Sequence, residues 1–159
     1  MSNLLSKFFS LPARHKCLLF KIWFLLGFYR AGVLCFSLKR LTARLEHHAQ
    51  AQPCALLSEN QETEAVAIGR LVAGAALVTP WQSLCLTQVL VAQRLLLKKN
   101  IPGQIYLGVR RVGEQVAHSG AESTDLSAHA WLQCGGQIVN GAGGSEQFAV
   151  VSVYSWQTP

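Results

Sequence analysis

The first 44 residues of the chain contain no aspartate or glutamate. Basic residues, in contrast, occur throughout this stretch: Lys7, Arg14, Lys16, Lys21, Arg30, Lys39, Arg40 and Arg44. The formal net charge of the whole chain is +6, so the remainder is close to balanced. An excess of positive charge suits nucleic acid, an anionic membrane or an acidic peptide. Because the excess is confined to the N-terminal segment, we expect it to stay outside the chemistry, and we expect no nucleic-acid partner.

Paired cysteine motifs are also missing. The chain has an odd number of widely spaced cysteines and no CxxC pair: Cys17, Cys35, Cys54, Cys85 and Cys134. This pattern argues against a disulfide framework or a zinc knuckle and indicates a reducing compartment. We therefore expect a cytoplasmic protein with no metal and no cofactor. At least one thiol needs another explanation.

An uninterrupted membrane-spanning run is missing as well. Residues 17–38 are strongly apolar, but Lys21 and Arg30 interrupt them, whereas a spanning helix needs about 20 apolar residues. No small-residue cleavage site follows, which disfavours a signal peptide. Three interpretations stay open: a helix packed on the domain or on a partner protein, an interfacial membrane helix, and a true span. We favour the first, and the second would make the protein membrane-associated through residues 17–38.

The chain divides by composition into three parts. Half of its 159 residues are hydrophobic, which is enough for one folded domain with an appendage. We interpret residues 1–45 as a basic, apolar helical segment and the polar residues 46–60 as a linker. Residues 61–159 form the expected domain.

Helical periodicity comes first within that domain. Ser58 and Gln61 have the form of a capping box before a helix over 61–77, which ends at Thr79-Pro80. Ser83 is the expected cap of a second helix that runs to Lys99.

Strand signals follow. We expect a strand over 104–110, a polar loop over 112–125, and a hairpin of 127–134 with 137–140 around Gly135-Gly136. Residues 148–154 give a last strand. Helices followed by antiparallel strands predict an α+β fold, with a helix packed on a small antiparallel sheet.

Cys85 and His129 are the candidate catalytic pair. Cys85 lies in the first turn of the second predicted helix, where free N–H groups favour a thiolate and form an oxyanion hole. His129 lies on a later strand, as the base does in papain-like enzymes. A lone cysteine or histidine is usually structural, but helix-start Cys, strand and then His strand is a specific order. A zinc site that joins Cys85, His129 and Cys134 is disfavoured, because the last two point to opposite faces of one strand.

Three stretches carry a resemblance to a known family. Residues 80–88 (PWQSLCLTQ), 101–109 (IPGQIYLGV) and 128–132 (AHAWL) resemble the transglutaminase-like cysteine peptidase domain of lasso-peptide maturation proteins, the leader peptidases called B proteins. The resemblance implies a papain/transglutaminase-like core preceded by basic, apolar N-terminal helices. It also implies a cysteine peptidase that removes the leader from a ribosomally made precursor peptide. A separate leader-recognition protein and a cyclase are the implied partners.

The chain departs from that family at one position. The family usually places an Asp, often preceded by Asn, on the hairpin strand that follows the His. Here Asn140 matches the Asn, and Gly141 occupies the Asp position. Asp125, the only aspartate, lies roughly 13 Å before His129 along an extended strand and on the wrong side of the motif.

Asn140 is therefore the expected third catalytic residue. A turn at Gly135-Gly136 places His129 opposite position 142, and Asn140 lies diagonally across on the same face. Its amide oxygen is expected to accept the His129 Nδ1–H, and a bulge in the hairpin would reconcile this register with the family's. Glu146 is the reserve candidate, and the absence of any side-chain orienter is the remaining alternative.

Further side chains are candidates for the substrate groove or the oxyanion hole: Trp81, Gln82, Gln88 and Trp131. Each has a structural alternative, since Trp is commonly a core residue and Gln88 is equally suited to the edge of a packing surface. Two functional alternatives also stay open. One is acyl transfer on the same fold, and the other is a non-enzymatic, membrane-associated scaffold that acts through the N-terminal helices.

Overall fold

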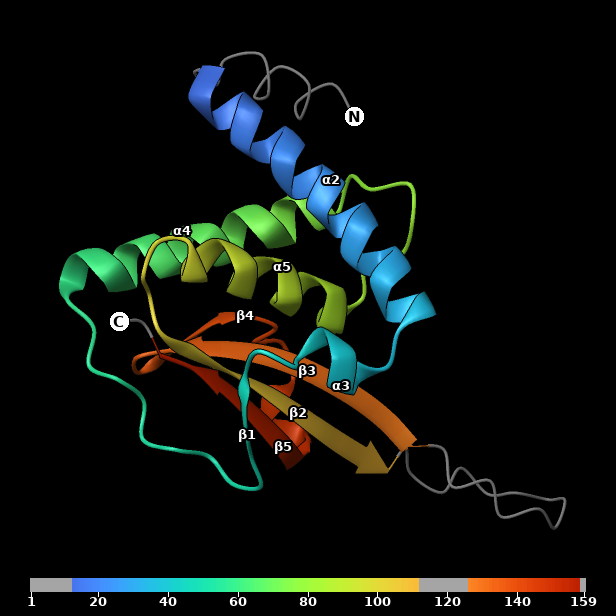
Figure 1. Cartoon of the computed structure of the whole chain (residues 1–159), viewed down its shortest axis with the longest axis vertical. Helices are drawn as coiled ribbons and strands as arrows, with labels where there is room; N and C mark the ends of the chain where they lie inside the picture. The colour runs from blue at the N-terminus through green and yellow to red at the C-terminus, as the bar shows by residue number, and fades with distance from the viewer. Residues whose placement is uncertain (1–12, 112–125, 158–159) are drawn as a thin grey trace, which may run out of the picture.

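The structure, a computed structural model, describes residues 13–111 and 126–157, with side chains from residue 17 onward (Figure 1). The predicted loop 112–125 lies outside the described residues. The helices of the described ranges are α2 (Ala13–Cys35), α3 (Leu38–Leu41), α4 (Glu59–Ala76), α5 (Cys85–Leu97) and the 3₁₀ turn η1 (Ser145–Gln147). The strands are β1 (Glu46–His48), β2 (Gly103–Arg111), β3 (Leu126–Cys134), β4 (Gln137–Asn140) and β5 (Ala149–Trp156).

The strands form one antiparallel sheet in the order β1-β5-β2-β3-β4. Helices α4 and α5 pack side by side over one face, with α4 over β4 and α5 over β3 (Figure 1). This arrangement confirms the predicted α+β class. Residues 46–48, which the sequence placed in a linker, instead form β1 and pair with the end of β5.

The two faces of the sheet have separate apolar clusters, because alternate residues of a strand point to opposite faces. Ile105, Leu132 and Trp156 face the helices and join the main core with residues of α2, α4 and α5. Tyr106, Trp131 and Val153 form the second cluster, on the other face. The cross-strand register, with Ile105 opposite Leu132 and Tyr106 opposite Trp131, keeps each cluster on its own side.

The caps at the ends of α4 and α5 agree with the sequence prediction, except for the N-terminal cap of α5. Ser58 and Gln61 form a reciprocal capping box at the start of α4, as expected. Asn100, at a φ of 53°, closes α5 in the left-handed conformation, and the Ile101 N–H reaches back to the Leu96 carbonyl. The exception is the cap of α5. This cap is Leu84, not Ser83, because the Ser83 hydroxyl hydrogen-bonds with Thr79.

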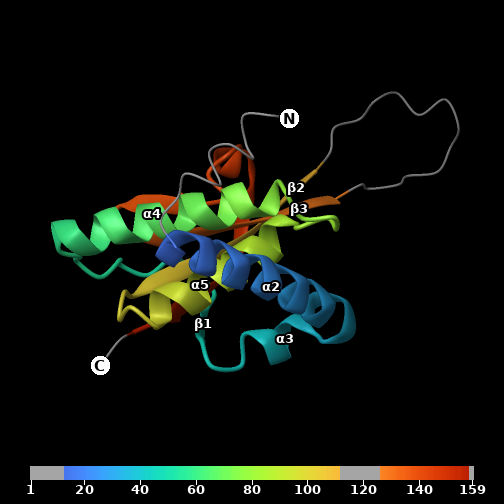
Figure 2. The same cartoon turned by 90° about the horizontal axis from the view of Figure 1, so that it is seen from above.

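Helix α2 packs on the domain through one face only. Ile22 and Leu26 are fully buried in the main core, and α2 crosses over α4 and α5 in the view from above (Figure 2). The helix is long and apolar enough over 17–35 to cross a membrane, yet only a small share of that stretch is buried. The favoured interpretation, a helix packed on the domain, holds for one face of α2, and the other face is exposed to solvent.

The closest approach between a helix and the sheet is at Gly69 of α4. A Cβ atom at this position would lie 1.8 Å from the carbonyl oxygen of Val139 in β4. Only glycine allows this contact, and the Gly69 carbonyl also accepts a hydrogen bond from the Asn140 side chain at 3.3 Å.

We therefore expect Gly69→Ala to lower the free energy of unfolding by about 2–3 kcal/mol, because β4 must move away from α4. Gly74→Ala on the same helix is the matched control, since a Cβ there meets nothing within 4 Å. That change should raise stability by about 0.5–1 kcal/mol, because alanine favours the helix. Denaturant unfolding followed by circular dichroism measures both, and equal stabilities of the two variants would contradict the packing argument.

Candidate active site

Cys85 is the first residue of α5 and is half-buried at the edge of the main core. Its position at the helix start agrees with the sequence prediction. Leu84, the preceding residue, makes no side-chain cap, so the N–H groups of the first turn are not used by a capping side chain. These N–H groups favour negative charge on the thiol or on a carbonyl oxygen attacked by it.

The turn before Cys85 is held by its own hydrogen bonds. Thr79 Oγ1 lies 2.9 Å from both the Trp81 carbonyl oxygen and the Ser83 hydroxyl. From inside α5, the Gln88 side chain donates to the Ser83 carbonyl at 2.7 Å. Gln88, a candidate for the substrate groove, therefore also fixes the turn that positions Cys85.

Trp81 attaches the same turn to α2. Its ring lies 4.7 Å, between centroids, from that of Trp23, and its edge lies against Gly27, where a Cβ would be 3.0 Å away. The buried Trp81 Nε1 has no hydrogen-bond partner among the described residues. Gln82 beside it is exposed. The structure thus places Trp81 in a packing contact and leaves Gln82 open to solvent.

His129 has one hydrogen bond that the sequence did not predict. Its Nε2 lies 2.8 Å from the main-chain carbonyl oxygen of Gly141. A carbonyl oxygen only accepts, so Nε2 carries the hydrogen, and Nδ1 makes no hydrogen bond with the described residues. The ring rests against Trp131 and Phe148, with centroid distances of 6.0 and 5.1 Å. Trp131 therefore lies under the histidine and limits the orientations of its ring.

The backbone at Gly141 leaves no room for a side chain. Its φ is +76°, a conformation that favours glycine, and a Cβ would lie 2.6 Å from the Ala130 carbonyl oxygen. In this backbone the position cannot hold a side chain, and the main-chain carbonyl lies where it contacts the imidazole. The expected bulge is confirmed, because the register shifts between Leu132 and Gln133, which moves the end of β4 by one residue.

Asn140 does not orient His129 in this structure, which corrects the prediction from hairpin geometry. The bulge places Asn140 opposite Leu132, whose side chain faces the helices, so the amide points to α4 and donates to Gly69. The Asn140 Oδ1 is buried without a partner among the described residues. The reserve candidate Glu146 is exposed on η1 and makes no hydrogen bond with His129. The only feature of the sequence that pointed to the main-chain acceptor of His129 was the glycine at position 141.

Cys85 and His129 are not hydrogen-bonded to each other in the structure. The thiol packs at the edge of the main core, and the imidazole packs on the second cluster. Their elements are nevertheless aligned. Helix α5 is followed by β2, which runs back beneath it, and β3 runs antiparallel to β2, so the start of α5 and the start of β3 lie toward the same end of the sheet (Figure 1). These packing contacts place the thiol on the helix side of the sheet and the imidazole on its other side, so the structure does not bring the predicted pair together.

We expect Gly141→Ala to disturb His129 specifically. The added methyl group must displace the turn, which removes the acceptor of the Nε2 hydrogen. Long-range ¹H–¹⁵N spectra of the imidazole should show the Nε2-protonated tautomer in the natural protein and a mixture in the variant. Gly143→Ala is the control, because a Cβ there meets nothing within 4 Å. An unchanged tautomer in Gly141→Ala would show that the carbonyl does not hold the ring.

The cysteines should differ in reactivity. Burial, with a smaller contribution from nearby Cys54, raises the pKa of Cys134 from 9.0 to about 12, so that thiol stays protonated at pH 8. Iodoacetamide at pH 8 should modify Cys85 faster than any other cysteine and leave Cys134 unmodified in the folded protein. Peptide mass mapping measures both, and unfolding in guanidinium should make all cysteines reactive. Modification of Cys134 at the rate of Cys85 would contradict this assignment.

Comparison with known proteins agrees with this architecture. The family model described as the transglutaminase-like superfamily matches residues 31–153, a range that includes Cys85, His129 and Gly141. None of the curated proteins or solved structures compared with the chain gives a match. The chain therefore belongs to the transglutaminase-like superfamily, whose members are typically cysteine peptidases or acyltransferases.

Proposed function

We propose that the protein is a cysteine peptidase in which Cys85 is the nucleophile and His129 is the base. The observation that carries the proposal is the bond from His129 Nε2 to the Gly141 carbonyl. This bond selects the tautomer with an unprotonated Nδ1, and an unprotonated nitrogen is what a base needs to take the thiol proton. The position of Cys85 at the start of α5 supports the same assignment.

The reaction would proceed through an acyl-enzyme. This requires the His129 ring to approach the thiol from the other side of the sheet. In that arrangement His129 Nδ1 removes the proton of the Cys85 thiol, and the sulfur attacks the carbonyl carbon of the scissile peptide bond. The oxyanion that forms is stabilised by N–H groups of the first turn of α5. The imidazolium then gives its proton to the leaving amine, and the C–N bond breaks. A water molecule, deprotonated by the same nitrogen, hydrolyses the thioester and frees the thiol.

The Gly141 carbonyl affects this cycle differently from a carboxylate. It holds the ring by a hydrogen bond but adds no full negative charge to stabilise the imidazolium. The thiolate–imidazolium pair must therefore rely more on the helix N-terminus and on the mutual attraction of the pair. We expect the site to be oriented as in a triad, with a weaker electrostatic contribution from its third member.

We further propose that the substrate is a ribosomally made lasso-peptide precursor, from which the enzyme removes the leader. Support comes from the residues around the site, namely the PWQSLCLTQ, IPGQIYLGV and AHAWL stretches. A separate leader-recognition protein would present the precursor, and a cyclase would close the freed N-terminus. The basic residues of 1–44 are suited to contacts with such partners.

The decisive experiment incubates the full chain with the precursor peptide encoded beside it and follows the product masses. Cys85→Ala and His129→Ala should each abolish cleavage, by a factor of about 10³ or more, while circular dichroism stays that of the natural protein. Cys17→Ala is the matched control and should retain full turnover, because this exposed thiol lies on α2.

Three results would redirect the assignment. Turnover by Cys85→Ala would show that the thiol is not the nucleophile. Loss of secondary structure in His129→Ala would favour a structural histidine. Products heavier than the expected hydrolysis fragments by the mass of an amine minus that of water would indicate acyl transfer on the same fold instead of hydrolysis.

A further inference from the structure

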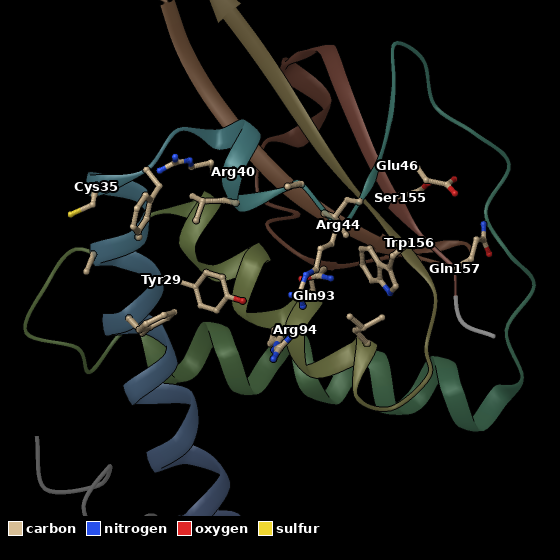
Figure 3. Close-up of a pocket in the computed structure, with 18 residues that line it drawn as sticks. Tyr29, Cys35, Arg40, Arg44, Glu46, Gln93, Arg94, Ser155, Trp156 and Gln157 are labelled. Atoms are coloured by element: carbon tan, nitrogen blue, oxygen red, sulfur yellow. The ribbon is translucent and has the colours of Figure 1, made fainter.

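A second concave site lies away from Cys85, at the other end of α5. A cavity of about 710 Å³ opens between the C-terminal half of α2, α3, the end of α5 and the end of β5 (Figure 3). Neither Cys85 nor His129 lines it. The proposed peptidase mechanism therefore does not use this cavity.

Most of the charged groups that line the cavity are cationic, and these cations are not in ion pairs with the described residues. Arg40, Arg44 and Arg94 line it, and none of them is in a salt bridge with a described residue. Glu46 is the only carboxylate among the lining residues; it is largely exposed and lies 3.9 Å from a nitrogen of His48. The net charge of the wall is thus positive, which favours an anionic occupant.

Gln93 adds an uncharged polar group to the wall of the cavity. Its side chain is only 8 % exposed, yet it makes no hydrogen bond with the described residues. In the close-up it lies in the middle of the cavity, near Arg94, and the Tyr29 hydroxyl points toward them (Figure 3). The amide atoms of Gln93 are not fully buried, so they are available to a polar group that enters the cavity.

An exposed aromatic stripe on α2 leads into the same cavity. Phe20, Phe24 and Phe28 recur every four residues and are 64, 59 and 72 % exposed, on the side of the helix away from buried Ile22 and Leu26. Phe28 also lines the cavity. Phe36, half-exposed at its rim, carries the Arg40 guanidinium 5.9 Å from its ring centroid.

We propose that this face binds the surface of an anionic membrane, with the phosphate of an acidic phospholipid in the arginine-lined cavity and the phenylalanine stripe in the interfacial layer. Aromatic rings flanked by basic residues, with Glu46 as the one carboxylate among the lining residues, are a composition that favours such surfaces. Ile22 and Leu26 are committed to the core, so α2 lies on the membrane and does not cross it. A second copy of this chain fits less well, because it would bring like charges together.

Vesicle sedimentation of the full chain tests the proposal. Vesicles of phosphatidylcholine with about 30 % phosphatidylglycerol should bind the protein at least tenfold more tightly than phosphatidylcholine alone, and 0.5 M NaCl should weaken that binding. The triple change Arg40→Gln, Arg44→Gln and Arg94→Gln should lower affinity at least tenfold. Phe24→Ser should do the same, since its ring is exposed and its loss leaves the core intact.

Matched controls separate specific binding from general charge and from catalysis. Arg70→Gln with Lys98→Gln removes exposed cations outside the cavity and should change affinity less than twofold. Cys85→Ala should bind vesicles as the natural protein does. A soluble glycerophosphate headgroup should compete only at millimolar concentrations if the bilayer contributes.

Four outcomes would overturn the proposal. The first is equal binding to neutral vesicles, and the second is full binding by the triple arginine variant. The third is competition by the soluble headgroup at micromolar concentrations, which would assign the cavity to a free phosphorylated metabolite. The fourth is a stable dimer in light scattering that Phe24→Ser dissociates, which would assign the stripe to a second copy.

Discussion

The contact between Gly69 and Val139 determines much of the site's geometry. Because Gly69 has no side chain, the backbone of β4 lies directly against α4, and Asn140 then reaches the Gly69 carbonyl. Asn140 is thereby committed to the helix side of the sheet, and the strand ends. The chain must turn at once, in a conformation that favours glycine, and that turn brings the Gly141 carbonyl to His129. A packing constraint between a helix and an edge strand thus determines which ring nitrogen of His129 carries the hydrogen.

Local signals predicted most of the fold. The capping box at Ser58 and the hairpin at Gly135-Gly136 depend on residues close in sequence, and the structure confirms both of them. The predicted cap of α5, Ser83, was wrong, because the Ser83 hydroxyl hydrogen-bonds with Thr79 instead. Strand β1 was missed because its pairing with β5 joins residues more than a hundred positions apart.

The candidate site was predictable to the extent that it depends on side chains. Cys85 and His129 were found by residue type and order, and the structure places one at a helix start and the other on β3. The group that orients His129 was not found from the sequence, because a main-chain carbonyl has no sequence signature of its own. The hairpin argument for Asn140 failed at the bulge. A single extra residue in the hairpin turns the Asn140 side chain from the face of the sheet that carries His129 to the face that packs on the helices.

The contact between the Trp81 and Trp23 rings has a consequence for how the chain is organised as a folding unit. The turn that presents the nucleophile rests on α2, so the N-terminal helix is a wall of the catalytic domain as well as an outer surface. If the domain were joined to a different N-terminal segment, that segment would have to supply an aromatic side chain for Trp81 to pack against. The apparent appendage is therefore a structural part of the site, and removing α2 would leave the turn before Cys85 without this support.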